Sequence, residues 1–140
     1  MAKRLTSDEF KYVYTRVPRL CVDLVVKNKD GVLLTLRNIP AAKGYWHFPG
    51  GTVLHGENLQ QACLRVGKEE LGVKVKVIKQ LYVIEYITFQ ANYGHAVSVA
   101  FLVNLDSSDI KLNQQASDFK FFRKVPDKAL KEIKKIWQNL

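Results

Sequence analysis

Hydrophobic residues in the first third of the chain follow a strand pattern that a turn interrupts. Residues 20–27 (LCVDLVVK) are apolar and rich in β-branched residues, apart from Asp23. This pattern predicts a buried strand with one acidic side chain that faces the interior or a site. The turn residues Asn-Lys-Asp-Gly at 28–31 lead to a returning strand at 32–37. We therefore expect the two strands to pair as a β-hairpin.

Three segments have the pattern of amphipathic helices. The first is predicted to run from a cap at Ser7 to about Tyr14. The second begins with a capping box, in which Asn58 is the cap and Gln61 follows three residues later, and it should end near Leu71 with Gly72 as its stop. The third starts at Asp127. Its apolar stripe is interpreted as core packing and consists of Leu130, Ile133, Ile136, Trp137 and Leu140.

The remaining apolar segments predict further strands. They are the aromatic segment 45–48, stopped by Pro49-Gly50-Gly51, the alternating segment 73–77, two long segments at 81–90 and 95–105 that a turn at 91–94 joins, and the short segment 119–122. There is no repeat, low-complexity tract or linker. A helix inserted among hairpins favours one mixed α/β domain over residues 1–140, with a sheet that is not all parallel.

The composition is that of an ordinary globular protein. Of the 140 residues, 47% are apolar and 25% are charged. No apolar run approaches the roughly 20 residues that span a membrane, and the first ten residues lack the apolar region of a secretion signal. Cys21 and Cys63 lie in apolar contexts without metal-ligand spacing. We expect both to be reduced core thiols, and the protein to be cytoplasmic and not membrane-bound.

The formal net charge of +9 favours anionic partners such as nucleotides, nucleic acid or acidic membrane surfaces. It does not select among them, because the Lys and Arg residues are dispersed. The densest basic run, Lys124 to Lys135, lies on the predicted final helix and is interpreted as a solvated face.

The stretch RVGKEELG, residues 65–72, has an unusual charge pattern. On a helical wheel, Glu69, Val66 and Glu70 lie at about 40°, 100° and 140° from Arg65. The opposite side of the wheel carries Leu64 and Leu71. The pattern predicts a helix with an acidic face and an apolar face.

This acidic face has two interpretations. One is a surface helix with an i,i+4 ion pair between Arg65 and Glu69. The other is a metal site, because Pro49-Gly50-Gly51 offers exposed backbone carbonyls, and carbonyl and carboxylate oxygens suit Mg²⁺ or Mn²⁺. Glu57, just before the helix, is placed to reach Arg65.

The spacing of these residues resembles the signature of the Nudix hydrolases, G-x5-E-x7-R-E-U-x-E-E-x-G-U, in which U is apolar. Seven of its nine specified positions match, namely Gly51, Glu57, Arg65, Glu69, Glu70, Gly72 and Val73. The resemblance implies the family's α/β/α sandwich with a mixed sheet. It also implies metal-dependent hydrolysis of nucleoside diphosphates linked to another group, with Mg²⁺, or alternatively Mn²⁺, as the cofactor.

Two positions depart from the signature. Val66 stands where the family has glutamate, which predicts a site with fewer metal ions. Gly67 stands where the family has an apolar residue, and it costs a helix about 0.5–1 kcal/mol relative to alanine. A close approach of another part of the chain would account for Gly67.

Beyond the signature, the quoted segments lie within residues 7–73 and are SDEF at 7–10, residues 18–27 with Asp23, LRN at 36–38, GYW at 44–46 and FPGG at 48–51. They resemble the GDP-mannose mannosyl hydrolases, which lack the same glutamate. The resemblance implies that the Gly50 carbonyl, Glu70 and Gln115 bind the metal. From the acidic helix face we expect Glu69 as a further metal ligand, and Glu69, Glu70 and Arg65 as the catalytic centre. The resemblance further implies that Asp23, Arg37 and His95 contact the substrate. A homodimer is a candidate assembly, because members of this subgroup form dimers, and Glu57 is expected to support Arg65.

The chain also departs from this subgroup. Thr52 replaces an arginine that would steady the leaving diphosphate, and Ala116 replaces the histidine base. Asp118 is an alternative base. The general base and the attacked atom, carbon or phosphorus, therefore stay open.

Three functions follow from these patterns. The favoured one is hydrolysis of a nucleotide sugar resembling GDP-mannose. The second is attack at phosphorus in a nucleoside triphosphate or a dinucleotide. The third is a catalytically weakened module that binds nucleotides or RNA. This function is supported by Val66, Thr52, Ala116 and the charge of +9. Binding of nucleic acid is not the favoured interpretation.

Overall fold

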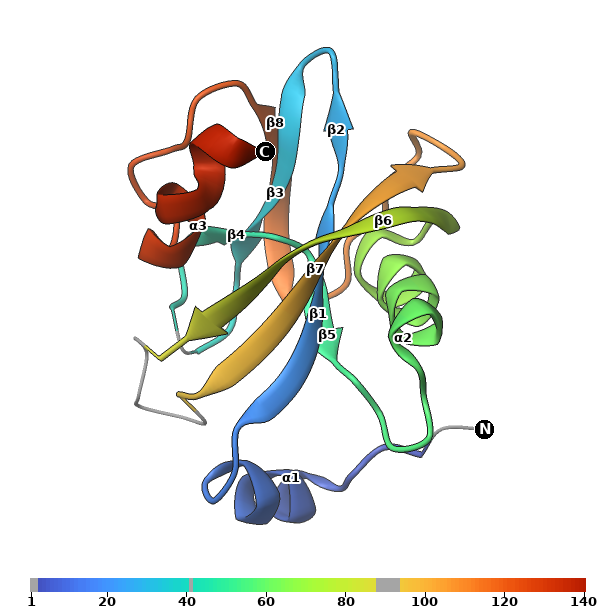
Figure 1. Cartoon of the computed structure of the whole chain (residues 1–140), viewed down its shortest axis with the longest axis vertical. Coiled ribbons are helices and arrows are strands. Elements are labelled where there is room, and N and C mark those ends of the chain that lie inside the picture. The colour runs from blue at the N-terminus through green and yellow to red at the C-terminus, as the bar shows by residue number, and fades with distance from the viewer. Residues whose placement is uncertain (1–2, 41, 88–93) are drawn as a thin grey trace.

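The computed structural model describes residues 3–40, 42–87 and 94–140. It contains two sheets and three α-helices (Figure 1). The helical elements are α1 (Ser7–Tyr14), α2 (Leu59–Val66), the π-helical turn η1 (Gly67–Leu71), α3 (Lys131–Ile136) and the 3₁₀ turn η2 (Trp137–Asn139). The strands are β1 (Arg19–Val25), β2 (Lys27–Asn28), β3 (Gly31–Arg37), β4 (Trp46–His47), β5 (Gly50–Thr52), β6 (Val75–Tyr86), β7 (Ala96–Leu105) and β8 (Ala116–Phe122).

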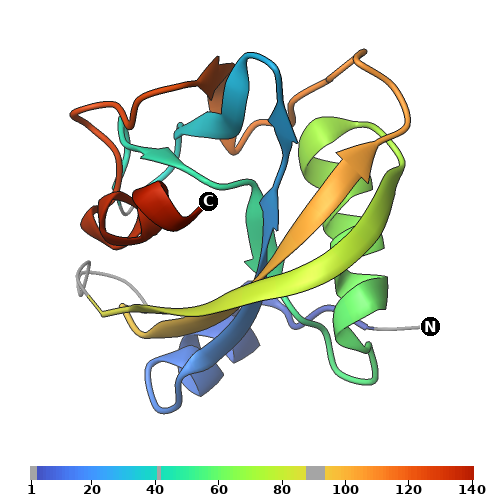
Figure 2. The same ribbon diagram turned by 45° about the horizontal axis from the view of Figure 1, so that its top comes forward.

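The first sheet has the order β5-β1-β7-β6 and is mixed, because β1 runs parallel to β7 while the other pairs are antiparallel. The second sheet is built on β3, which pairs antiparallel with β2, β4 and β8. This arrangement confirms the predicted α/β class with a mixed sheet. The α/β/α sandwich is also confirmed, since α2 and α3 lie on opposite sides of the strands (Figure 2).

Two apolar clusters hold these layers together. One lies under α2 and joins Ala62, Cys63, Val66 and Leu71 to strand residues such as Val22. The other lies under α3, where Leu130 and Ile133 are buried and Ile136, Trp137 and Leu140 pack against them. The apolar stripe of the last helix is therefore core, as predicted. Cys21 and Cys63 are free and buried.

The strand predicted at 20–27 is divided between the two sheets. Only Lys27 and Asn28 form the expected hairpin with the returning strand, whereas β1 pairs with β5 and β7. The prediction of one long hairpin is wrong for β1. The partners of β1 lie far along the chain, so no local pattern signals them.

The aromatic strand β4 ends before Pro49-Gly50-Gly51, as predicted, and Gly50 and Gly51 also open β5, where they pair with Asp23 and Val22 of β1. A Cβ on Gly50 would lie only 2.4 Å from an Asp23 carboxylate oxygen, so no larger residue fits at this position. The close pairing of β5 with β1 thus depends on the missing side chain.

One strand, β6, covers most of the described part of the two predicted segments 73–77 and 81–90. It continues across two irregularities in its pairing with β7. The expected antiparallel pairing with segment 95–105 is confirmed, while residues 91–93 of the predicted turn lie outside the described ranges. The predicted starts of two helices are wrong. Thr6, not Ser7, caps α1, since its side chain accepts from Glu9 N, and α3 begins at Lys131 rather than Asp127.

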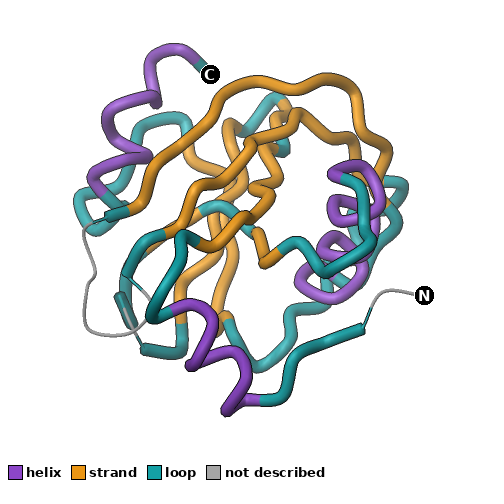
Figure 3. The backbone as a smooth tube through the Cα atoms, turned by 60° about the horizontal axis from the view of Figure 1, so that its bottom comes forward, coloured by secondary structure: helices purple, strands orange, loops and turns teal. Residues whose placement is uncertain are grey.

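Helix α1 lies at one end of the first sheet, and the segment before it extends toward α2 (Figure 3). None of the described helices has the length and the apolar character needed to cross a membrane.

Candidate active site

Helix α2 is positioned by its ends and by its buried face. Asn58 and Gln61 form the predicted capping box, with bonds of 2.8 and 2.9 Å, and Gly72 ends the helical segment in a left-handed conformation with φ 67°. Gly67 lies against β6, where a Cβ would meet a Val75 side-chain carbon at 2.6 Å. A close approach is therefore present at Gly67, and the neighbouring group is the Val75 side chain. It allows the wide π-helical turn to seat against the sheet.

The helical wheel was wrong for two side chains. Val66 is 1% exposed and packs in the core beside Gly51, whereas Leu64 is 40% exposed. The α2 face that covers the sheet therefore includes Val66, which the wheel placed among the acids. A glutamate at this position would enter an apolar core, so the absence of an acid here agrees with the packing.

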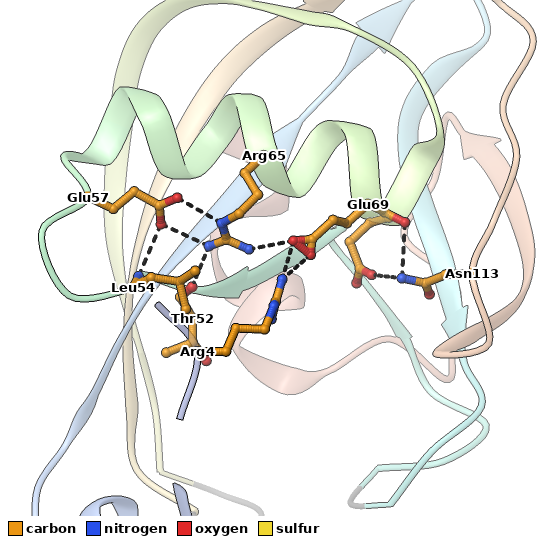
Figure 4. A network of polar contacts seen from close by, with 8 residues as sticks. Arg4, Thr52, Leu54, Glu57, Arg65, Glu69 and Asn113 are labelled. Carbon is orange, nitrogen blue, oxygen red and sulfur yellow. Dashed lines mark hydrogen bonds and ion pairs between the residues drawn. The ribbon is translucent and has the colours of Figure 1, made fainter. Parts of the chain in front are cut away.

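Arg65 is the centre of a polar network (Figure 4). It binds both oxygens of Glu57, at 2.7 and 2.9 Å, and donates to Glu69 at 2.9 Å and to the Thr52 carbonyl at 2.8 Å. Glu57 in turn accepts from Leu54 N at 3.0 Å. The Arg65 guanidinium is the main cause of the lowered pKa of Glu57. The predicted support of Arg65 by Glu57 is thus present, and the pair ties β5 and the loop before α2 to the helix.

Glu69 has a second cationic partner that sequence reasoning missed. The Arg4 guanidinium contacts both oxygens of the Glu69 carboxylate (Figure 4). Lys3 forms an isolated antiparallel bridge with His55, and this bridge holds the N-terminal segment beside the loop before α2. No pattern around Arg4 signals such a contact over 65 residues. His55 itself is exposed.

Glu70 is the half-buried acid of the site. Its carboxylate accepts a hydrogen bond from the Asn113 side-chain amide, which also donates to the Glu69 carbonyl at 3.0 Å (Figure 4). Burial raises the pKa of Glu70, and the neighbouring Glu69 raises it further. Asn113 is thus the hydrogen-bond partner of the Glu70 carboxylate. Gln115 is exposed, and its backbone N–H donates to the Asn113 side chain at 3.0 Å. Its role as a metal ligand stays a prediction.

The predicted substrate residues differ in their surroundings. Asp23 is 7% exposed and accepts from the Tyr86 hydroxyl at 2.6 Å, while burial raises the pKa of Asp23 to about 6. Arg37 is half-buried, and its pKa is lowered by burial and then by Arg19. His95 is exposed and binds β1 through its backbone carbonyl, which accepts from Arg19 N at 2.9 Å.

His47 and Asp118 both form hydrogen bonds with nearby backbone atoms. His47 is held by its ring Nδ1 against the Phe48 carbonyl at 2.6 Å, and burial lowers the pKa of His47 to about 4. The His47 ring is thus a buried, neutral group held by the backbone. Asp118 lies exposed on β8, and its carboxylate accepts from Phe119 N at 2.8 Å.

The donor set suits a divalent cation that prefers oxygen. Glu70 and Glu69 are adjacent carboxylates, and Gly50 belongs to β5, which packs against α2. Burial is the main reason that the pKa of Glu70 is raised, while the hydrogen bond from the Asn113 amide acts in the opposite direction. Among the described residues, no three His, Cys, Asp or Glu side chains gather as a metal cluster. A cation here would therefore rely on backbone, water and substrate oxygens as well, which is typical of Mg²⁺.

Comparison with known proteins identifies the family. A model of the NUDIX domain matches residues 17–138. The chain belongs to the Nudix family. It is a Nudix hydrolase, and the matched region spans both sheets and all the residues of the Arg65 network except Arg4.

Two curated relatives and one solved structure illustrate the range of this Nudix hydrolase's neighbours. The low-salt glycan biosynthesis protein Agl8 of Haloferax volcanii is 36% identical over 124 residues, which is 85% of this chain and 80% of Agl8. The ADP-ribose pyrophosphatase of Methanocaldococcus jannaschii is 30% identical over 112 residues, 80% of this chain and 66% of that protein. A MutT Nudix hydrolase from Burkholderia pseudomallei superposes with a TM-score of 0.79 at 22% identity, over 89% of this chain and 99% of that one.

Proposed function

We propose that this Nudix hydrolase cleaves a nucleoside diphosphate linked to another group, that a nucleotide sugar is its favoured substrate, and that it requires Mg²⁺ or, alternatively, Mn²⁺. The proposal depends above all on Glu70, a half-buried carboxylate beside a second carboxylate with a neutral amide as its partner. A divalent cation bound by Glu70, Glu69 and the Gly50 carbonyl would neutralise the diphosphate and stabilise the leaving group.

The protein's own residues have distinct tasks in this proposal. Arg65 holds Glu69 through a 2.9 Å bond and so fixes the carboxylate for its ligand role. Arg37 is a half-buried guanidinium whose donors suit phosphate oxygens. Asp23 is a buried acceptor, held by Tyr86, that could receive hydrogen bonds from hydroxyl or amide groups of a substrate.

The preference for a nucleotide sugar has two supports. The resemblance to the mannosyl hydrolase subgroup implies that Asp23 and Arg37 contact the substrate, and the relative from Haloferax volcanii is named for glycan biosynthesis. The alternative of attack at phosphorus is supported by the relative named an ADP-ribose pyrophosphatase. Homodimer formation and binding of nucleic acid stay predictions.

The test is a hydrolysis screen of GDP-mannose, other nucleotide sugars, ADP-ribose and nucleoside triphosphates with Mg²⁺ or Mn²⁺. Reactions in ¹⁸O-labelled water identify the attacked atom. Label in the free sugar, with an intact nucleoside diphosphate, indicates attack at carbon. Label in a phosphate product indicates attack at phosphorus and would reject the mannosyl hydrolase mechanism.

Glu70→Gln tests the metal site, with Glu85→Gln on the exposed surface of β6 as a matched control. We expect Glu70→Gln to abolish turnover and Glu85→Gln to retain it. Absence of any turnover by the wild type, together with nucleotide binding, would support the weakened binding module instead.

A further inference from the structure

Arg19, the first residue of β1, has donor groups that the protein does not fully use. Its Nη1 donates to the Thr52 hydroxyl at 3.0 Å, and its guanidinium carbon lies 5.8 Å from the centre of the Phe10 ring. Its Nε is buried, and no acceptor binds it within the described residues. No ion pair is present between Arg19 and a described acid. A buried donor without an acceptor is rare in folded proteins and calls for a ligand or a functional reason.

The strand pairing places Arg19 on the same face as other site candidates. Side chains alternate along a strand, so Arg19, Cys21 and Asp23 point to one side of β1. Val22 points to the other side, where it joins the core under α2. Thr52 is the partner of Cys21 across the β1–β5 pair, which brings its side chain to the Arg19 face. Arg19 thus shares the face turned away from α2 with the buried carboxylate of Asp23.

A second arginine approaches from the other sheet. Arg37 ends β3, and Arg19 lies close enough to lower the pKa of Arg37 by repulsion, after the larger effect of burial. Glu70 acts on the same Arg37 with the opposite sign. Both guanidiniums are partly buried, and an anion bound between them would relieve their mutual repulsion.

We propose that Arg19 binds the phosphate groups of the substrate together with Arg37. The ligand class is a diphosphate ester, and the inference rests on the proposed function. Thr52 contributes by orienting the guanidinium, because its hydroxyl accepts from Nη1, while Nε has no acceptor among the described residues. Guanidinium groups bind phosphate oxygens through parallel hydrogen bonds, so a lysine cannot fully replace Arg19.

The experiment compares the wild type with Arg19→Gln, Arg19→Lys and the control Arg123→Gln. Arg123 carries the same charge but is exposed beyond β8, where it donates to the Lys29 carbonyl. Isothermal titration with inorganic pyrophosphate, GDP, ADP and UDP, each with Mg²⁺, gives the affinities. Circular dichroism and the thermal midpoint verify that each variant is folded.

We expect Arg19→Gln to weaken binding of pyrophosphate and of the preferred nucleoside diphosphate by about tenfold or more, the loss of one charge-assisted contact. Arg19→Lys should fall between the wild type and Arg19→Gln, and Arg123→Gln should bind as the wild type does. In the hydrolysis assay, Arg19→Gln should raise KM more than it lowers kcat.

The outcomes separate this inference from the proposed function. A wild type that hydrolyses a nucleotide sugar, with an Arg19→Gln variant of equal affinity and KM, overturns the role of Arg19 alone. Arg19-dependent binding of diphosphates without hydrolysis supports the anion site and counts against the proposed reaction. A wild type that binds no diphosphate overturns both the proposed function and the role of Arg19. If Arg123→Gln loses as much diphosphate affinity as Arg19→Gln, the loss reflects net charge alone and the role of Arg19 is overturned.

Discussion

Asn113 joins the two acids of the site, because its side-chain amide donates to the Glu70 carboxylate and, at 3.0 Å, to the backbone carbonyl of Glu69. The same side chain accepts from Gln115 N, so the loop before β8 is fixed to the end of the helical segment. Residues that orient a metal ligand through a hydrogen bond affect affinity without touching the ion.

Replacement of Asn113 by alanine is expected to weaken binding of Mn²⁺ or Mg²⁺ by about tenfold, since Glu70 loses the donor that orients it. Titration calorimetry with each ion measures the change. Asn104→Ala, at an exposed position of β7, is the control and should bind as the wild type does. Equal affinity in both variants would show that Asn113 does not position Glu70.

The Gly67→Ala variant is expected to be less stable by about 1–2 kcal/mol, although alanine is the better helix former. The new Cβ would lie 2.6 Å from a Val75 side-chain carbon, inside contact distance. Urea denaturation of Gly67→Ala, Val75→Ala and the double variant measures the free energy of unfolding. The double variant should recover part of the loss caused by the alanine, because Val75→Ala removes the clashing atoms. A single variant as stable as the wild type would refute the close approach.

Arg65→Met is expected to lower the free energy of unfolding by about 2–3 kcal/mol. The Glu57 side chain is 6% exposed, and in this variant it would lose its cation while the Thr52 carbonyl loses a donor. Lys111→Met is the comparison, because its 3.7 Å pair with Asp109 is exposed and should contribute less than about 0.5 kcal/mol. Chemical denaturation of both variants at pH 7 supplies the values, and similar losses would contradict the central role of Arg65.

His47 predicts a specific pH dependence of stability. Burial and the nearby Arg37 lower the pKa of His47 from 6.5 to about 4, so the folded protein holds this ring neutral. The unfolded chain takes up a proton below about pH 6.5 and the folded chain only near pH 4. The contribution of the neutral His47 ring to the free energy of unfolding is therefore fully present above about pH 6.5 and is lost as the pH falls toward 4.

The difference between wild type and His47→Gln in free energy of unfolding should shrink by up to about 3 kcal/mol between pH 7 and pH 4. Denaturation series at several pH values measure this difference. All other titratable groups are the same in both proteins, so their effects on the difference cancel to first order. A constant difference for His47→Gln would show that the ring titrates normally.

Short-range chemistry allowed much of this protein to be predicted from its sequence. The capping box at Asn58 and the left-handed stop at Gly72 depend on neighbouring residues only, and both are present. The spacing of Glu57, Arg65 and Glu69 predicted their contacts. Glu57 directly precedes the cap and lies about two helical turns from Arg65, and Arg65 and Glu69 form an i,i+4 pair. The signature indicated the family, and the family match confirms it.

Long-range pairing determined what the sequence left open. The division of the strand at 20–27 and the pairing of Gly50 and Gly51 with β1 depend on partners tens of residues away. Burial of Val66 follows from the sheet packed beneath α2, which a helical wheel does not include. The contacts of Arg4 and Asn113 with the acidic residues likewise require the chain to fold back on itself. Local sequence thus determined the helix and its charges, while the tertiary structure decided which charges are buried and what faces them, because desolvation depends on every element that packs around a group.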